Sequence, residues 1–506
     1  MNKDLLSGIG FDNLYDKVLE KVLPTFSDTS THIDIYIDNE SKFIEIVEKM
    51  TGLKVSFARN RSNHNYPPLN SSSVKVTEGD LSTLIGTGTD IMRRPHSIAS
   101  LLKAKAEFLE RLSSSLPLDI AKGVEFDIAK TLDIVKAKKL KIKSLINGDT
   151  LYKNYEDIYY FLNRNIKNTN LDIGNTNDLN VNIENKKNLQ MTTNGCAGHF
   201  DYDKAVCAGW LEYIQRDGFL MHWLNSISPK VIDVDTHYLN IVDTKNNIYN
   251  ANIGAVYTAN NNSISSQDIS KILLNLKKYN LEYYFLDITS DIAVSNVLCV
   301  IVVEVNGIKR LQMGAGTGFD ADKAIFSSAI EALAGCSFRH GRQGSHENIV
   351  QSIKDNKYIP FTDKNINQNV RQDMYYHKDM IKYIDFIYKS KETITVEDWA
   401  GVSAIRGFDI KRLSSDTKYQ LEYLKHIFKE KIEAGNDDYN VYVYEYKNKL
   451  IKYFDFKAVR VICPALYSLY LNESFADPNH PRLAEFIKNK GLENKAKINI
   501  WPHPFP

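Results

Sequence analysis

Two segments of the sequence carry side chains of matching type at the same spacing. Glu107, Glu110 and Arg111 stand at positions i, i+3 and i+4 of the first, and Glu212, Gln215 and Arg216 repeat this spacing in the second. On a helix, such residues share one face. Carboxylates on one face repel each other unless a cation joins them, and Mg²⁺ binds both carboxylate and triphosphate oxygens. An adjacent arginine offers parallel donors to a phosphate, so the pattern indicates a magnesium-nucleotide site.

The same spacing also has a purely structural interpretation. Glutamate and arginine four residues apart on a helix commonly form a solvated ion pair that contributes only about 0.2–0.5 kcal/mol. The neighbours of Glu212 favour the functional interpretation, because the segment from Ala205 to Leu211 is almost entirely apolar or small. A charge on a packed helix needs a partner.

An internal repeat places a third glutamate in the same context. Phe200–Ala205 and Phe319–Ala324 read FDYDKA and FDADKA, and they lead after seven residues to Glu212 and Glu331. Acidic residues at the start of each segment suit the positive end of a helix dipole. The sequence therefore predicts that one unit, a helix with an inward-facing glutamate, occurs more than once.

Small residues precede each of these helices, and we predict a tight turn at each place. The stretches are Asn194–Gly198 and Gly314–Gly318, and a looser third copy runs from Gly86–Asp90 into the helix with Glu107. Gly314–Gly318 lacks the Lys-Ser/Thr ending of a P-loop and the spacing of a dinucleotide-binding loop. It is therefore predicted to be structural.

Alternating and periodic apolar residues predict a mixed α/β chain with helices packed on mixed sheets. The predicted strands are Ile33–Ile37, Lys54–Ala58, Val231–Asp235, Tyr283–Ile288, Val297–Val305, Val441–Tyr446 and Ala458–Cys463. The predicted helices cover residues 10–30, 40–50, 365–395, 415–433 and 482–489. Residues 163–190 are dominated by asparagine, which favours turns, and are expected to form an exposed connector.

Composition narrows the classes of partner and compartment. The 506 residues include 63 basic and 62 acidic side chains, so no overall field attracts nucleic acid or an anionic membrane. No apolar run reaches the length of a bilayer span or of a signal peptide. The five cysteines have no CxxC spacing, and the odd number suits a reducing cytoplasm. Neither a nucleic-acid nor a membrane partner is predicted.

At this point the motifs resemble a known family. Asn194-Gly195-Cys196-Ala197 followed by Glu212-Tyr213-Ile214-Gln215-Arg216-Asp217 looks like the Asn-Gly-x-Ala and Glu-x-x-Glu-Arg-Asp pattern of YcaO proteins. Glu107 to Arg111 resembles their earlier glutamate helix, and Gly314 to Glu331 their third one. Thr51-Gly52 resembles the start of the domain, Val459 to Pro464 a late strand, and Pro502-His503-Pro504-Phe505-Pro506 the proline-rich ending.

The resemblance implies a YcaO-type fold over residues 51–506, after an N-terminal α/β extension at 1–50, and binding of ATP and Mg²⁺. It assigns Mg²⁺ contacts to Glu107, Glu110, Glu212 and Gln215, and nucleotide contacts to Glu107, Arg111, Asn194, Glu212, Arg216, Glu331 and Arg460. Gln215 departs from the family's glutamate and brings an oxygen without a charge. Lys103, Ala334 and Gly335 also depart from the family pattern.

The ending of the chain points to one branch of the family. Alternate prolines fix φ and give a stiff arm, which could equally be an extended end that binds a partner. In azoline-forming members this ending reaches the active site, so the resemblance implies roles in the reaction for Pro506, His503 and Pro504. The implied activity is ATP-dependent cyclodehydration of Cys, Ser or Thr in a ribosomally made precursor peptide.

Two other functions fit parts of the same pattern. A sulfide or amine could attack the activated amide and give a thioamide or an amidine. A non-catalytic scaffold that binds a peptide is the alternative from another class, because Gln215 and the third helix are altered. The resemblance further implies a leader-binding partner related to ubiquitin-activating enzymes, and a flavin dehydrogenase that oxidises the ring.

Overall fold

The structure is a computed structural model, and it describes residues 40–61, 67, 69–77, 85–90, 98–115, 139–154, 193–239, 264–305, 307–339, 347–355, 357–362, 366, 368–401 and 407–505. The predicted helix over residues 10–30, the predicted strand Ile33–Ile37, the connector at 163–190 and Pro506 lie outside these ranges.

The described strands form three sheets, which confirms the expected mixed fold. The first has the order β1-β2-β3 (Val55–Arg61, Asn70–Val76, Ile85–Asp90). The second has the order β5-β4-β12-β13-β6 (Thr150–Asn154, Lys139–Ser144, Tyr442–Tyr446, Lys457–Ile462, Cys196–His199). The third has the order β10-β9-β8-β7-β11 (Ile308–Thr317, Asn296–Val305, Glu282–Asp287, Lys230–Ile232, Thr393–Ile394). Neighbouring strands are antiparallel except β7 and β11, which are parallel.

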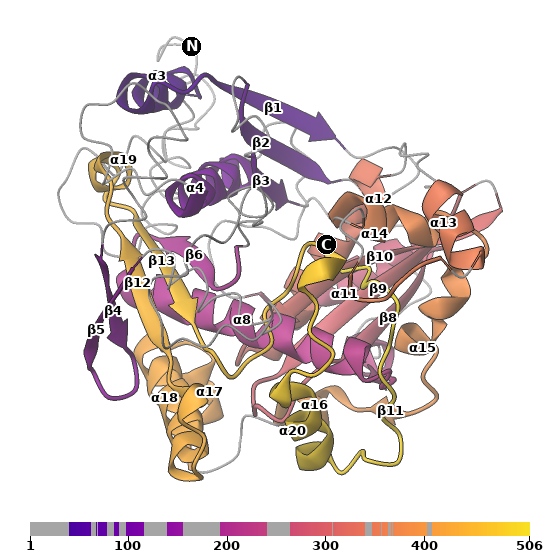
Figure 1. The fold of residues 1–506 in the computed structure, drawn as a ribbon. Coiled ribbons are helices and arrows are strands. Elements are labelled where there is room, and N and C mark those ends of the chain that lie inside the picture. Colours follow the sequence, from indigo (N-terminus) through magenta and orange to yellow (C-terminus); the bar gives the residue numbers. More distant parts are fainter. Residues whose placement is uncertain are drawn as a thin grey trace.

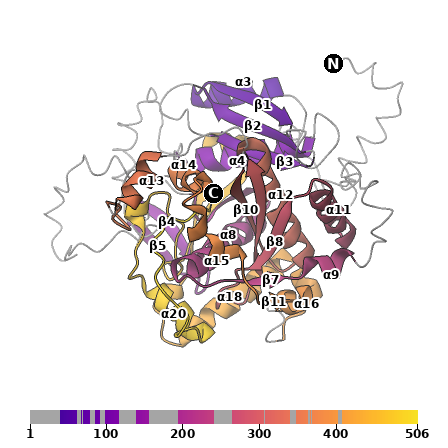
Figure 2. The ribbon, with the colours of Figure 1, turned by 90° about the vertical axis from the view of Figure 1, so that its right-hand side faces the viewer.

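Three helices connect these sheets. Helix α8 (Tyr202–Leu224) runs through the middle of the molecule, between the second sheet and the third, and it contacts β6, β13 and β10 (Figure 1). Helix α4 (Ile98–Ser115) packs on the first sheet and reaches β6 and β13. Helix α12 (Ala321–Arg339) covers β9 and β10, with α11 (Ser266–Lys278) beside it (Figure 2). The three glutamate helices therefore belong to one body.

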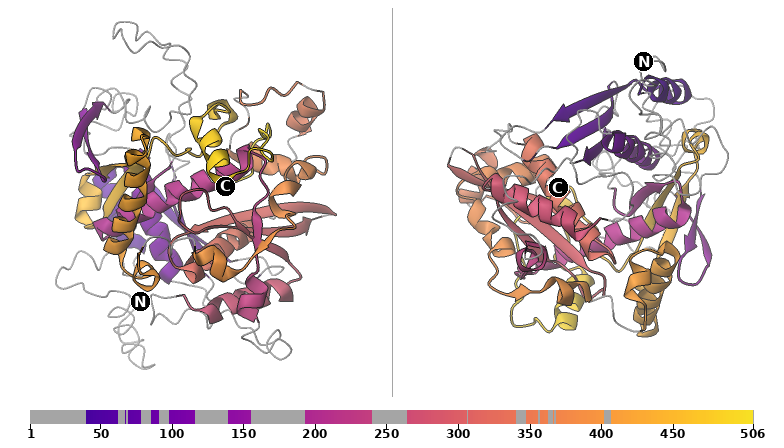
Figure 3. Two further views of the ribbon diagram at one scale, coloured as in Figure 1. Left: turned by 90° about the horizontal axis from the view of Figure 1, so that it is seen from below. Right: turned by 180° about the vertical axis from the view of Figure 1, so that it is seen from behind.

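The described part of the chain holds further α-helices, and Figure 3 shows the molecule from below and from behind. They are α3 (Glu40–Thr51), α9 (Val234–Leu239), α13 (Glu347–Lys354), α14 (Gln368–Asp373), α15 (Asp385–Tyr388), α16 (Val396–Ala400), α17 (Ile410–Leu413), α18 (Thr417–Glu433), α19 (Lys449–Tyr453) and α20 (Pro481–Lys490). In the described part of the chain, no helix combines the length and the apolar character needed to cross a bilayer.

Strand β9 shows why the third sheet is covered on both faces. Its residues 296–303 are all buried, as the unbroken apolar run of the sequence requires. Successive side chains of a strand point to opposite faces. Residues 298, 300 and 302 join one core with Phe219, and residues 297, 299 and 301 join another with Ile325. The sheet is thus held between two apolar layers.

Two of the three predicted turns are strands, and this corrects the sequence interpretation. Gly314–Gly318 lies mostly in β10, and Gly86–Asp90 lies within β3. The turn predicted at Asn194–Gly198 is confirmed at its start, where Cys196 N donates to Thr193 O at 2.9 Å and Gly195 has φ of +67°, before the chain enters β6. In β10 and β3 the glycines serve close packing rather than chain reversal. A Cβ atom on Gly314 would lie 2.4 Å from the backbone oxygen of Ser328 and 2.4 Å from the backbone nitrogen of Ala332. Only a residue without a side chain lets α12 lie this close to β10.

Other predicted elements have mixed outcomes. The helices at 40–50, 415–433 and 482–489 are confirmed as α3, α18 and α20, and the strands Lys54–Ala58, Tyr283–Ile288, Val297–Val305, Val441–Tyr446 and Ala458–Cys463 as β1, β8, β9, β12 and β13. The single helix over 365–395 is wrong, because buried Met374, Tyr375 and Met380 anchor an irregular path between α14 and α15. The strand Val231–Asp235 ends at Ile232, because the Asp233 side chain accepts from Thr236 N and starts α9.

The N-terminal boundary at residue 51 stays a prediction. Phe43 of α3 stacks on Phe454 at 5.4 Å and meets Phe57 edge-on at 5.8 Å. Helix α3 therefore shares a core with residues from both ends of the chain.

Candidate active site

The same contact holds the key glutamate of each of the three helices. One carboxylate oxygen accepts a hydrogen bond from a backbone N–H that precedes the helix: from Thr87 to Glu107 (2.7 Å), from Gly195 to Glu212 (2.9 Å) and from Ala315 to Glu331 (2.8 Å). The Thr87 hydroxyl adds a second donor to Glu107 at 3.0 Å. The repeat read from the sequence is therefore a repeat of geometry.

The glycines beside these contacts are equivalent as well. A Cβ atom on Gly86 would meet the backbone of Ala104 and Phe108 at 2.3–2.6 Å, as one on Gly314 would meet Ser328 and Ala332. Phe108 follows Glu107 directly, and Ala332 follows Glu331. Each strand glycine thus brings a helix backbone close enough for the next strand N–H to reach the glutamate.

Arginines pair with two of the three glutamates. Arg111 Nη2 lies 2.6 Å from Glu107, and Arg216 Nη2 lies 2.7 Å from Glu212, each four residues along the helix. The third helix has Gly335 at this position, and a Cβ atom there would lie 2.7 Å from Gln312 Oε1. The arginines that pair with these glutamates therefore come from α4 and α8.

The electrostatics show that these glutamates form one cluster. Burial first, and then the Glu212 and Glu107 carboxylates, raise the pKa of Glu110 well above its ordinary value. Burial also raises the pKa of Glu212, against the effect of Arg216 and Arg111. The Glu331 side chain is solvent-exposed, yet the protein atoms around its carboxylate and the nearby Glu212 raise its pKa. Within the described residues, neither Glu110 nor Glu331 forms an ion pair.

Asn194 and Arg460 complete the cluster on the side of the second sheet. Asn194 Oδ1 accepts from Arg216 Nη1 at 2.5 Å, and its backbone oxygen accepts from Arg460 Nε at 3.4 Å. Arg460 is buried in β13 opposite Cys196, and its charge acts on Glu212. The structure thus brings both residues to the predicted site.

Gln215 lies one turn beyond Glu212 and is half-buried. Its backbone oxygen accepts from Asn296 Nδ2 at 3.1 Å, which fixes the main chain there. Its role as a metal ligand stays a prediction.

The donor set fits a hard cation together with a phosphate chain. In the described part of the chain, no three His, Cys, Asp or Glu side chains are arranged as a complete metal cage. Mg²⁺ rarely needs such a cage, because it keeps waters and takes one or two carboxylates plus phosphate oxygens. Glu110 and Glu331 are carboxylates without an ion-pair partner in the described residues, and three arginines lie beside them. ATP and Mg²⁺ therefore fit the residues present.

The C-terminal tail, residues 500–505, is bound through its backbone carbonyls. Four side chains donate to it in order: Tyr358 to Ile500 (2.9 Å), Trp223 to Trp501 (3.0 Å), Tyr375 to Pro502 (2.5 Å) and Arg371 to Phe505 (3.2 Å). Prolines have no N–H to satisfy, so carbonyl acceptors suffice to bury this segment. Figure 1 shows the chain end at the centre of the molecule rather than at its edge.

The tail packs on the helix that carries Glu212. The ring of Phe505 lies 4.6 Å from Phe219, seven residues after Glu212 on α8. His503 is fully buried, and its Nε2 lies 3.0 Å from Tyr470 O. Burial and the Arg371 charge hold the pKa of His503 well below its ordinary value.

A neutral, enclosed imidazole suits anchoring of the tail, and the proton-transfer role of His503 stays a prediction. Pro504 is half-buried, and Pro506 lies outside the described residues. Their roles in the reaction also stay predictions.

Sequence reasoning missed several residues that hold this arrangement. Asp217 stood within the quoted motif but received no role. Arg371 and Arg482 belong to no motif whose spacing would mark them. All three are completely buried. Their partners come from distant parts of the chain, so only the fold reveals them.

Comparisons with known proteins agree with this geometry. Residues 179–467 match the family model described as YcaO cyclodehydratase, ATP- and Mg²⁺-binding. The structure of YcaO from Methanopyrus kandleri bound with AMPPCP and Mg²⁺ is similar, with a TM-score of 0.50 and 13% identity, over 89% of this chain and 95% of that one. A heterocyclase in complex with substrate and cofactor is also similar, with a TM-score of 0.53 and 12% identity, over 92% of this chain.

This chain spans 57% of the length of that heterocyclase. No curated protein sequence matches the chain. At these identities the two solved structures support the fold, whereas the family model covers more than half of the sequence itself. The chain therefore belongs to the YcaO cyclodehydratase family, which binds ATP and Mg²⁺.

Proposed function

We propose that this chain closes thiazoline or oxazoline rings in a precursor peptide by ATP-dependent cyclodehydration of Cys, Ser or Thr residues. One observation carries the proposal: the glutamate and arginine cluster and the proline-rich tail meet on the same helix, α8. The cluster suits a magnesium nucleotide, and Phe505 of the tail packs on the same helix at Phe219. Among YcaO chemistries, the tail favours ring closure.

The proposed ligands follow from the cluster. The Mg²⁺ ligands are Glu107, Glu110, Glu212 and Gln215, and the nucleotide contacts are Glu107, Arg111, Asn194, Glu212, Arg216, Glu331 and Arg460. Arg216 is held at both ends, by Glu212 at 2.7 Å and by Asn194 at 2.5 Å, so its guanidinium group is already oriented before a phosphate arrives. Such preorganised donors stabilise charge that develops during a reaction.

Ring closure requires the carbonyl oxygen of the substrate amide to leave. The thiol or hydroxyl of the substrate adds to the preceding amide carbon, and the carbonyl oxygen takes the negative charge. ATP, when bound, supplies the phosphoryl group that turns this oxygen into phosphate, a good leaving group. The arginines of α4 and α8 neutralise the oxyanion and the phosphate oxygens. Loss of the amide proton and of phosphate then leaves the C=N bond of the ring.

The proton transfers are assigned to the chain end. The attacking group and the amide nitrogen each lose a proton, and the terminal carboxylate of Pro506 is the proposed acceptor. His503 and Pro504 hold the tail in place, supported by the contact of His503 with Tyr470 O. In this assignment the tail takes part in the reaction as well as in the fold.

The partners are part of the proposal too. The chain spans only 57% of a heterocyclase whose structure contains substrate and cofactor. We therefore propose that a separate leader-binding protein, related to ubiquitin-activating enzymes, presents the peptide, and that a flavin dehydrogenase can oxidise the product. All five cysteines are free and buried, which supports a reducing cytoplasm as the compartment.

Removal of Pro506 alone tests the proposal. This change moves the terminal carboxylate back by one residue and leaves Phe505 in its core position against Phe219. The substrate is a Cys-, Ser- or Thr-rich peptide encoded beside the gene of this chain, and mass spectrometry follows its mass. The wild type should remove one water per ring, and the shortened chain should lose this activity but still bind Mg²⁺-AMPPCP.

Other outcomes identify the alternatives. Exchange of oxygen for sulfur would show thioamide formation, and exchange for nitrogen would show amidine formation. If peptide and partner stimulate no phosphate release from ATP, the chain is a scaffold. Unchanged turnover without Pro506 would overturn the role of the terminal carboxylate.

A further inference from the structure

A short loop between β13 and α20 touches both halves of the proposed site. We call residues 467–470 the hinge loop, and two successive carbonyls of this loop face different partners. Leu469 O accepts from Asn194 Nδ2 at 2.7 Å, and Asn194 holds Arg216. Tyr470 O accepts from Arg371 Nη1 at 2.6 Å and faces Nε2 of His503 at 3.0 Å. The hinge loop thus lies between the arginine cluster and the tail.

One buried carboxylate fixes the hinge loop from the side of α8. Asp217, the residue after Arg216, accepts from Tyr467 N through Oδ1 at 2.9 Å. Ser468 is also tied to α8, through a hydroxyl contact with Tyr213. The first two residues of the loop are therefore attached to α8, while the next two carbonyls reach the cluster and the tail.

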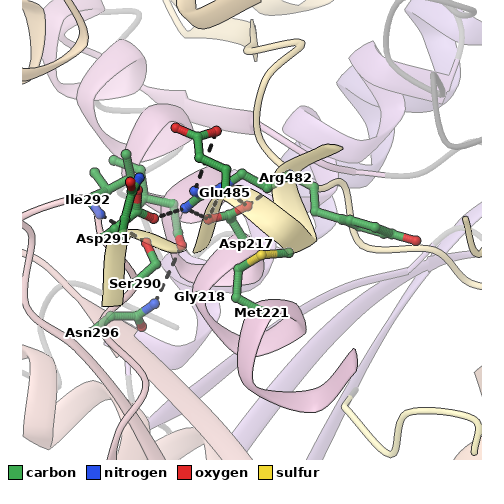
Figure 4. A network of polar contacts seen from close by, with 12 residues as sticks. Asp217, Gly218, Met221, Ser290, Asp291, Ile292, Asn296, Arg482 and Glu485 are labelled. Carbon is green, nitrogen blue, oxygen red and sulfur yellow. Dashed lines mark hydrogen bonds and ion pairs between the residues drawn. The ribbon is translucent and has the colours of Figure 1, made fainter. Parts of the chain in front are cut away.

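Arg482 of α20 neutralises Asp217. Its Nε lies 3.1 Å and 3.2 Å from the two carboxylate oxygens, and its Nη2 lies 2.8 Å from Oδ2 (Figure 4). Both side chains are completely buried. A buried carboxylate that lacked this partner would be strongly unfavourable, so the pair keeps Asp217 in place to accept from the loop.

The same arginine also pairs with a carboxylate that does not touch the hinge loop. Asp291 lies 2.5 Å from Arg482 Nη2 and accepts from Lys431 at 2.7 Å and from Asn489 at 2.6 Å. These partners belong to α18 and α20, and Figure 4 shows Asp291 on the other side of the guanidinium group from Asp217. Asp291 therefore offers a control with the same arginine partner.

We propose that Asp217 is a positioning residue that, through Tyr467 N, fixes the hinge loop and so couples nucleotide binding at the cluster to the position of the C-terminal tail. This inference rests on the proposed function, because it takes the cluster as the nucleotide site. The ion pair with Arg482 keeps the Asp217 carboxylate in place. The contacts form a continuous path from Arg216 through Asn194, Leu469 and Tyr470 to His503.

Hydrogen–deuterium exchange of the full chain, with and without Mg²⁺-AMPPCP, tests the coupling. Two proteolytic fragments report on it, residues 463–472 and residues 493–505. The second includes the amides of Lys497 and Asn499, which donate to Asn225 O and Leu224 O at the end of α8. In the wild type, Mg²⁺-AMPPCP should slow exchange in both fragments by about tenfold, because local opening becomes less favourable.

Asp217→Ala should abolish the slowing in the tail fragment and should speed exchange of residues 463–472 without nucleotide. Asp217→Asn keeps an oxygen for Tyr467 N and should restore the slowing, although the ion pair is lost. Asp291→Ala removes a partner of the same arginine and should keep the slowing. Exchange in α11 serves as a reference for general loosening.

Two results would overturn the inference: a wild-type tail that does not respond to bound AMPPCP, or equal loss of coupling in Asp217→Ala and Asp291→Ala. If the alanine variant does not fold, the wild-type response still decides. A wild type that binds no Mg²⁺-AMPPCP would instead refute the proposed function. Exchange of the nucleotide-free fragments in Asp217→Ala would then still report whether Asp217 fixes the loop.

Discussion

Replacing Gly314 by alanine should damage both the fold and the site. Its added Cβ atom would lie 2.4 Å from backbone atoms of Ser328 and Ala332, whereas an ordinary contact begins at 3.4 Å. Helix α12 must therefore move by about 1 Å or β10 must deform, because no flexible side chain can yield. Such overpacking typically costs about 1–3 kcal/mol of unfolding free energy.

The displacement reaches the cluster directly. Ala315 N, the next residue along β10, donates to Glu331 at 2.8 Å, and Glu331 precedes Ala332 on α12. A shift of about 1 Å lengthens this hydrogen bond beyond useful range. A loss of about 1.4 kcal/mol of binding free energy would raise the Kd for Mg²⁺-AMPPCP about tenfold. Urea unfolding and titration calorimetry measure the two effects.

Gly401→Ala is the matched control. Gly401 has φ of −66° and no heavy atom within 4 Å of an added Cβ atom. Alanine there should change stability by less than about 1 kcal/mol, in the stabilising direction, and should leave the Kd unchanged. If Gly314→Ala unfolds and binds AMPPCP like Gly401→Ala, close packing is not the reason for the strand glycine.

Two further predictions concern charge. Gln215→Glu adds a carboxylate beside Glu212, so it should tighten Mg²⁺-dependent AMPPCP binding several-fold in titration calorimetry, and unchanged Mg²⁺ dependence would place Gln215 outside the metal site. Protonation of two buried histidines should oppose folding in acid, because burial lowers the pKa of His222 to about 4 and holds the pKa of His503 well below its ordinary value, whereas an unfolded histidine takes up protons below about pH 6.5. His222 should therefore contribute a loss of about 2 kcal/mol of unfolding free energy between pH 7 and pH 5, and urea unfolding should show that His222→Gln removes this contribution.

The sequence predicted the parts of the site that depend on local spacing. The pairs Glu107 with Arg111 and Glu212 with Arg216 follow from helical periodicity alone. The repeat correctly placed Glu331, because the same FDxDKA start gives the same helix phase. Capping aspartates were recognised for the same reason: Asp201 accepts from Lys204 N at 2.9 Å, as its place before the helix suggests.

Contacts between distant segments could not be predicted in this way. Glycine-rich stretches suggested turns, since sequence alone does not show that a helix backbone lies against the strand. The bond between Asp217 and Arg482 joins residues 265 positions apart. Likewise, the tail was expected to be a stiff arm, and only the fold shows four donors on its carbonyls. Such pairings are set by topology, for which a single sequence gives no signal.

Two carboxylates among the described residues, Asp217 and Glu110, differ in a way that separates structure from function. Asp217 has Arg482 on both oxygens and accepts from Tyr467 N, so its charge is balanced by the protein itself. Glu110 has no ion pair among the described residues, and burial and neighbouring glutamates raise its pKa well above the ordinary value. A protein built only for stability would not keep such a residue, because its ionised form disfavours folding. A bound cation would remove this imbalance, and this supports our proposal that the glutamate cluster, rather than the better-connected Asp217 network, binds Mg²⁺ and a nucleotide.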